Sequence, residues 1–217
     1  MNTSTPELIG WTALVGGVIG VIGFISLALL FAVGEPFGTI NDILSIPVAF
    51  LMLPLVVTLY RLNAADHPTL SLVALAVGIA GFFAAAIGSA LLVLHRISFE
   101  QSLLPGIGGF GLIGLWVLIN CALALGGQTL PKGTALAGLL LAVTPSLIIL
   151  ATLRVSSVVT VLNSFAEPSS FTGQASPLFY AVVVLGMVSY AGLPFWFIQM
   201  GRLALMGRVA AAAVAVP

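Results

Sequence analysis

Residues 10–33 read GWTALVGGVIGVIGFISLALLFAV, an unbroken apolar run without a charged side chain. The hydrocarbon core of a bilayer is about 30 Å thick, and about 20 helical residues cross it. The run is long enough for this, and it lacks the alternation of apolar and polar residues that marks a barrel strand. It therefore predicts a transmembrane α-helix.

Five further stretches of the same character follow, at residues 43–60, 70–94, 107–125, 133–153 and 177–200. Turn-forming residues separate them, and most connections are short, so consecutive helices are expected to be antiparallel neighbours. The pattern contains no evident internal repeat and no second domain. We therefore predict an all-α fold in which residues 1–217 form one polytopic bundle of six transmembrane spans.

Polar residues mark the ends of several spans. Asn41 and Asp42 directly precede the second span and are predicted to cap its N-terminus. Two segments leave alternatives open. Residues 155–166 carry apolar side chains at helical spacing and either form an interfacial helix or continue the fifth span, and residues 203–217 either extend the sixth helix or fray.

The composition excludes several classes of protein. Of the 217 residues, 60% are apolar and only 6% are charged, whereas a water-soluble domain carries about a quarter charged residues. These values argue against a soluble enzyme, a nucleic-acid-binding protein and a disordered chain. The single cysteine, Cys121, leaves no pair for a disulfide, and there are only two histidines. We therefore expect neither a metal site nor a cofactor.

The charged residues avoid the middle of every predicted span. Six basic and six acidic residues fall in connections, tails or span ends. Ionisable groups at membrane depth usually mark proton relays or ion paths, so their absence there argues against a proton-coupled transporter, a pump or a voltage sensor. A Ser or Cys nucleophile would also lack its activating base. We therefore do not expect an enzyme.

The basic residues predict an orientation. Six spans place both termini on one side of the membrane. The tails and connections on that side hold Arg61, Lys132, Arg202 and Arg208. The opposite connections hold Arg96 and Arg154. By the positive-inside rule, both termini are expected to be cytoplasmic.

Small residues recur at one-turn spacing in several spans. In lipid, helices associate mainly through packing, and small residues let their backbones approach closely. The residues predicted to lie at helix contacts are Gly16, Gly20, Gly78, Gly81, Gly108 and Gly111. These contacts form either within the bundle or with a second copy or partner. Residues 106–111 also match G-x-G-x-x-G, but no acidic residue lies between Glu100 and Glu167, so a dinucleotide site is not expected.

Three polar residues lie away from the span ends. They are Asn120 in the fourth span, and Thr144 and Ser146 on either side of Pro145 in the fifth. An intramembrane Asn usually bonds across helices, and hydroxyl groups satisfy the backbone groups that a proline frees. These residues therefore serve the packing of the bundle or, alternatively, line a cavity between kinked helices.

His95 ends the third span and is the one candidate ligand for a haem or a pigment. A cationic side chain at a helix C-terminus also interacts favourably with the helix dipole. This structural role is the favoured interpretation of His95.

Four short motifs resemble those of a known group of membrane proteins. They are LYRLN at 59–63, LSLVAL at 70–75, LPKG at 130–133 and LPFW at 193–196, the last followed by Gly201-Arg202. In these motifs and in its layout the chain resembles the domain of unknown function 4386 family. It departs from that pattern at Val77-Gly78, where the family carries an aromatic-basic pair. The resemblance implies six spans and residence in the bacterial inner membrane, and it implies no particular activity.

These observations favour a non-catalytic integral membrane protein that serves as an accessory or scaffolding subunit of a larger membrane assembly. Its expected partners are the lipid bilayer and other membrane subunits or further copies of the chain, and not nucleic acid. The alternative is a small transporter or channel for a neutral or apolar solute, with Asn120, Thr144 and Ser146 lining its cavity. A third hypothesis, an enzyme or pigment binder, depends on His95.

Overall fold

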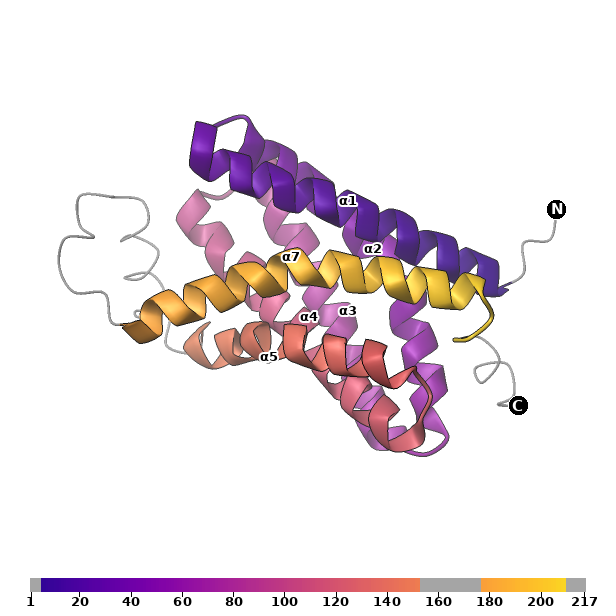
Figure 1. Cartoon of the computed structure of the whole chain (residues 1–217). Helices are drawn as coiled ribbons and strands as arrows, with labels where there is room; N and C mark the ends of the chain where they lie inside the picture. Colours follow the sequence, from indigo (N-terminus) through magenta and orange to yellow (C-terminus); the bar gives the residue numbers. More distant parts are fainter. Residues whose placement is uncertain (1–4, 153–176, 210–217) are drawn as a thin grey trace.

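The computed structural model describes residues 5–152 and 177–209, which form six α-helices without a strand (Figure 1). The helices are α1 (Thr5–Val33), α2 (Phe37–Ala64), α3 (Pro68–Val93), α4 (Phe99–Gly127), α5 (Lys132–Thr152) and α7 (Pro177–Leu205). The all-α class is thus confirmed for the described residues. Residues 155–166 lie outside them, and of residues 203–217 the structure shows that α7 continues to Leu205.

Five of the described helices are long and apolar enough to cross a membrane. They are α1, α2, α3, α4 and α7, and the stretch Lys132–Leu147 of α5 is apolar as well. Many large apolar side chains on these helices face outward, including Trp11, Phe31 and Leu140. An outer surface of this kind suggests a lipid environment.

The helices form a closed ring in which each packs against its neighbours in the chain. α7 lies between α1 and α5 and closes the ring, and its contact with α5 is the less extensive of the two. The start of α1 and the end of α7 lie at the same end of the bundle, as Figure 1 shows. We call this the terminal end, and it also holds the α2–α3 and α4–α5 connections.

The helix α2 begins earlier than the sequence predicted, so the predicted capping role of Asn41 and Asp42 is wrong. α2 starts at Phe37, and both residues lie in its second turn. The capping acceptor is instead Glu35, whose Oε2 accepts hydrogen bonds from the backbone N and the Oγ1 of Thr39, at 3.3 and 3.2 Å. This carboxylate satisfies a free N–H of the first turn, and the helix can therefore begin before the apolar run does.

The helix α4 also begins earlier than predicted, at Phe99 instead of residue 107. A capping box explains the difference. The backbone N of Gln101 donates to Ser98 Oγ at 3.3 Å, and the backbone N of Ser98 donates to Gln101 Oε1 at 3.0 Å. Two free donors are satisfied reciprocally, and the polar start of α4 becomes helical.

The helices α3 and α7 end in the same motif. His95 follows α3 with a φ of 54°, and Gly207 follows α7 with a φ of 71°. In α3 the backbone N of Arg96 donates to Leu91 O at 2.9 Å and that of His95 to Leu92 O at 2.9 Å. This is a Schellman motif, in which a left-handed residue allows the last carbonyls to be satisfied.

Aromatic side chains fill the centre of the ring. Phe82 of α3, Trp116 of α4, and Trp196 and Phe197 of α7 are all buried. The Trp116 ring lies 5.6 Å from Phe82, 6.3 Å from Trp196 and 6.4 Å from Phe197 between centroids, in tilted or edge-to-face geometry. We call these four residues the aromatic core. They join α3, α4 and α7 across the ring.

Candidate functional site

Five polar residues from three helices gather near the end opposite the terminal end. They are Asn41, Asp42 and Ser45 of α2, Ser89 of α3 and Tyr190 of α7. Tyr190 donates from its hydroxyl to Asn41 Oδ1 at 3.1 Å, and Ser89 Oγ donates to Asp42 Oδ1 at 3.3 Å. We call these five residues the polar cluster. It connects α2 to both α3 and α7.

Asp42 gives the polar cluster its only carboxylate. It is half-buried, and it is the one acidic residue of the described chain that lies beyond the first turn of a helix. Ser45 Oγ donates to the backbone O of Asn41 at 2.9 Å, one turn back along α2. The Tyr190 ring packs against Phe24 of α1 and Phe110 of α4, with centroids 6.3 and 5.1 Å apart.

The polar cluster was not found from the sequence. Asp42 was placed just outside the second span, because the apolar run starts at residue 43 and the capping by Glu35 has no apolar signature. Asn41 and Tyr190 are 149 residues apart, so only the fold brings them together. The chain nevertheless holds a hint, since Asn41 and Ser45 stand one helical turn apart.

A second buried network lies toward the terminal end. Asn63 Nδ2 donates to Asn120 Oδ1 at 3.1 Å and to the backbone O of Leu59 at 3.1 Å. Asn120 Nδ2 donates to the backbone O of Trp116 at 2.9 Å, and Thr129 Oγ1 donates to Asn63 Oδ1 at 3.2 Å. We call this the amide network. It ties α2 to α4 and to the connection after α4.

The three residues predicted as candidate cavity linings do not form one group. Asn120 belongs to the amide network and is 1% exposed. Ser146 Oγ donates to the backbone O of Ala142 in its own helix at 2.6 Å, and Thr144 is half-buried. No hydrogen bond in the described part of the chain joins Asn120 to either residue of α5.

Five of the six predicted helix-packing glycines lie at seams between the described helices. A Cβ on Gly16 would meet the Met52 side chain of α2, and one on Gly20 the Pro194 ring of α7. On the other side of the ring, Gly78 faces Trp116.

The backbones of α3 and α4 also approach each other closely. A Cβ on Gly81 would lie 3.0 Å from the carbonyl O of Gly109. Gly111 faces Pro145 of α5, whereas a Cβ on Gly108 would meet no other described segment within 4 Å, so Gly108 lies at no seam within the described bundle. The sequence missed Gly109, although it lies in the same glycine-rich run.

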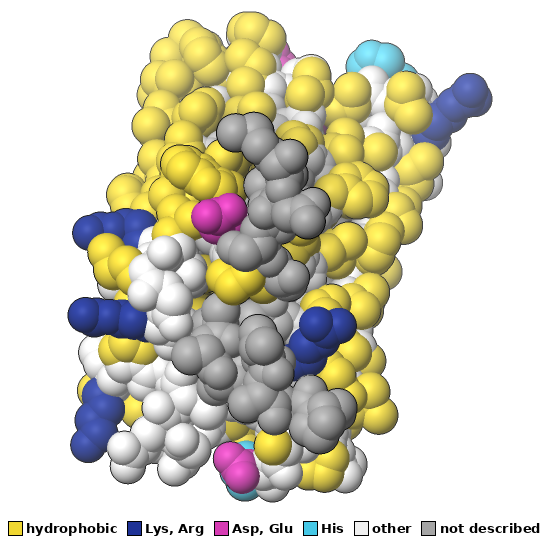
Figure 2. Space-filling view, turned by 90° about the vertical axis from the view of Figure 1, so that its right-hand side faces the viewer, with side chains coloured by type: hydrophobic (Ala, Val, Ile, Leu, Met, Phe, Trp, Pro, Cys, Tyr) yellow, Lys and Arg dark blue, Asp and Glu magenta, His cyan; other side chains and the backbone are white. Residues whose placement is uncertain are grey.

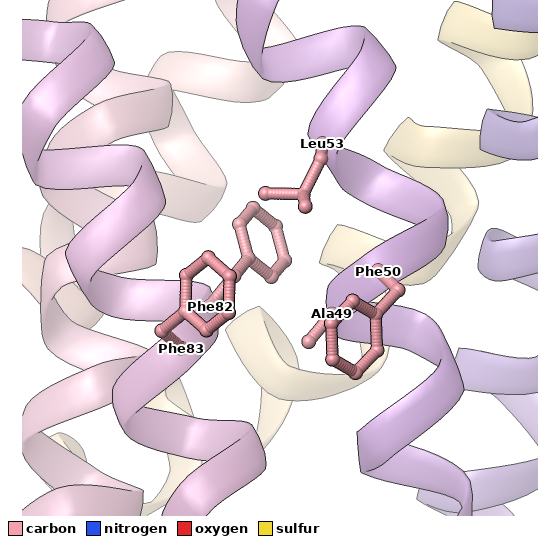
Figure 3. Close-up of a pocket in the computed structure, with 5 residues that line it drawn as sticks. All are labelled: Ala49, Phe50, Leu53, Phe82 and Phe83. Atoms are coloured by element: carbon pink, nitrogen blue, oxygen red, sulfur yellow. The ribbon is translucent and has the colours of Figure 1, made fainter.

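A small apolar crevice opens between α2 and α3 (Figure 3). Its lining is Ala49, Phe50, Leu53, Phe82 and Phe83, and it is too shallow to enclose a water molecule. The rings of Phe50 and Phe83 meet edge to face with centroids 5.9 Å apart. No polar side chain lines it, so it offers contact to apolar groups alone.

The remaining candidates stand apart from one another. His95 is exposed in the connection after α3, and Cys121 is buried in α4. Within residues 5–152 and 177–209, no group of three His, Cys, Asp or Glu side chains could hold a metal ion. Comparison with protein-family models, curated proteins and solved structures gives no match to this chain.

Proposed function

We propose that the chain is a non-catalytic, six-span protein of the inner membrane that acts as an accessory or scaffolding subunit. The observation that carries the proposal is a contrast between its inside and its outside. The aromatic core and the amide network close the centre of the ring, while large apolar side chains face outward on all six described helices, in a regular stripe on α1 and in another on α5. A molecule built in this way acts through contact with its neighbours.

The proposed contact surface is the stripe on α5, which we call the apolar stripe. Leu136, Leu140, Val143 and Leu147 are 51%, 77%, 45% and 57% exposed. Their spacing of four, three and four residues is that of a helix–helix seam with left-handed crossing. Leu140 is the most exposed large apolar side chain among the described residues. We propose that a helix of another subunit, or of a second copy, packs along this stripe.

The sixth span is part of the same proposal. The helix α5 runs from Lys132 to Thr152, a length of 21 residues, and it contains the apolar stretch Lys132–Leu147. About 20 helical residues cross the hydrocarbon core, so the length of α5 supports its role as a sixth span. The resemblance to the domain of unknown function 4386 family supports the six-span layout and the inner-membrane location.

Site-specific photocrosslinking tests the proposal. A photoreactive residue at Leu140 should crosslink the chain to a protein partner or a second copy in native membranes. The matched control is Leu72 of α3, which is 56% exposed on a different helix and should contact lipid. In mild detergent the partner should co-purify in a fixed ratio. A lone monomer with lipid adducts at both positions would contradict a scaffolding role.

The alternative, a transporter for a neutral or apolar solute, requires a path through the bundle. Two of its three candidate residues already form hydrogen bonds within the bundle, since Asn120 bonds to Asn63 and Ser146 bonds to its own helix. No observation on the described residues favours this alternative over scaffolding, and we do not adopt it.

A further inference from the structure

The two ends of the described bundle carry opposite charge. The terminal end holds Arg61, Lys132, Arg202 and Arg208, with the acidic residues Glu7 and Asp66. The other end holds Arg96, with the acidic residues Glu35, Asp42 and Glu100. Four basic and two acidic residues give the terminal end a net charge of +2. One basic and three acidic residues give the other end a net charge of −2.

The basic side chains at the terminal end are free to bind a ligand. We call Arg61, Lys132, Arg202 and Arg208 the basic rim. All four are exposed, and none forms an ion pair or a hydrogen bond with the described residues. Figure 2 looks onto this end and shows Lys and Arg side chains, in dark blue, projecting from its edges. Their charge is therefore directed outward from the bundle.

The basic rim lies at the ends of the apolar helices. Arg61 and Arg202 are in the last turns of α2 and α7, and Lys132 is the first residue of α5. Trp11 of α1 is 55% exposed near the same end, and Tyr60 directly precedes Arg61. Trp and Tyr mark the boundary between hydrocarbon and headgroups. Cations just beyond that boundary meet the phosphate layer.

We propose that the basic rim binds the headgroups of anionic phospholipids in the leaflet at the terminal end. A guanidinium group donates two parallel hydrogen bonds to a phosphate, and the net charge of +2 favours a lipid whose headgroup is itself negative. Zwitterionic lipids carry a compensating cation and gain little from this rim. The acidic opposite end provides no such attraction, so binding is confined to one leaflet.

Lipid titration with single-end variants tests this proposal. The purified full chain in neutral detergent is titrated with phosphatidylglycerol or phosphatidylcholine, and bound lipids are counted by native mass spectrometry. The chain should prefer phosphatidylglycerol. Each cation near an anionic headgroup is worth about fivefold in affinity, so the double variant R202Q/R208Q should lose about twenty-fivefold. The conservative R202K/R208K should keep most of the preference.

The matched control is R96Q, which removes one basic residue from the opposite end. It should leave the affinity for phosphatidylglycerol unchanged. Equal losses in R96Q and R202Q/R208Q, or no loss in either, would overturn the proposal. Because the rim side chains are exposed, the variants should unfold at the wild-type temperature in lipid-free detergent, which separates lost binding from lost folding.

Two further conditions identify the ligand. High salt should weaken the preference for phosphatidylglycerol, because exposed charges are screened. Inorganic phosphate at the same concentration should neither compete nor stabilise the chain. Competition by phosphate alone would assign the rim to a soluble anion and would refute lipid binding.

Discussion

The hydrogen bond between Asn63 and Asn120 joins two helices that otherwise touch little, since α2 and α4 are not neighbours in the ring. Both side chains are buried, at 3% and 1% exposure. Interhelical hydrogen bonds in membrane proteins are worth about 0.6 to 2 kcal/mol. Removing one partner of such a bond can cost more stability than the bond itself contributes, because the buried amide that remains keeps its full desolvation penalty.

The substitution Asn120→Leu should therefore destabilise the bundle by about 1 to 3 kcal/mol. It removes the acceptor of one N–H of Asn63 Nδ2, which is then buried without a partner, while the other N–H still donates to the backbone O of Leu59. The double variant N63L/N120L should be more stable than the sum of the two single effects predicts, because no orphaned amide remains. Unfolding in detergent with increasing denaturant measures all three variants. Strictly additive effects would show that the two amides are not coupled.

The left-handed residues at the ends of α3 and α7 give a matched pair of tests. His95→Gly removes a Cβ from a residue with a φ of 54° and should raise stability by about 1 kcal/mol. Gly207→Ala adds a Cβ at a φ of 71° and should lower it by a similar amount. Thermal unfolding in detergent measures both shifts. A loss of stability in His95→Gly, or a gain in Gly207→Ala, would contradict the Schellman geometry. A visible chromophore lost on His95→Gly would revive the pigment hypothesis.

At the scale of whole helices, the apolar runs predicted the existence and order of the elements well, and their ends poorly. Hydrophobicity reports which residues face lipid, while a helix begins where its first N–H groups find acceptors. Glu35 and the Ser98–Gln101 box supply those acceptors outside the apolar runs. The polar cluster was missed for the same reason, and because contacts such as that between Asn41 and Tyr190 span most of the chain.

The seam between α3 and α4 allows a test with adjacent residues. A Cβ on Gly109 would lie 2.7 Å from the backbone N of Ala85 and 2.9 Å from the carbonyl O of Gly81, whereas a Cβ on Gly108 would meet nothing within 4 Å. Gly109→Ala should therefore force the backbones apart and destabilise the bundle by about 1 to 3 kcal/mol.

Gly108→Ala is the control for that test. It should be neutral or stabilising by up to about 1 kcal/mol, since alanine favours a helix more than glycine does. Both variants are measured by denaturant unfolding in the same detergent. Equal destabilisation by the two substitutions would show that Gly109 is not required for the close approach of α3 and α4.

At the scale of the whole molecule, the ring gives the bundle two chemically different ends. The terminal end carries the basic rim, and the opposite end carries the polar cluster with Asp42. The positive-inside rule predicts that the terminal end faces the cytoplasm. This assignment and the antiparallel order of the helices can be tested together, because the chain has one cysteine, and Cys121 is buried.

Thiol labelling provides that test. His67→Cys and His95→Cys place exposed, uncharged thiols at the two ends, in the connections before and after α3. A membrane-impermeant reagent should label His95→Cys in intact cells and His67→Cys only after the membrane is opened. The unmodified chain should stay unlabelled in both conditions. Reversed labelling would invert the orientation, and labelling of both from one side would contradict a transmembrane α3.

The closure of the ring by α7 has a consequence for how the protein is made. The face of α1 that holds Gly10, Gly17 and Gly20 finds its complement only in α7, against Leu205, Ile198 and Pro194. Ribosomes add about 5 to 20 residues per second, so the first helix leaves the exit tunnel roughly 10 to 40 s before its mate. During that interval the glycine face of α1 lacks the helix that it packs against, so the ring can close only after α7 has been made.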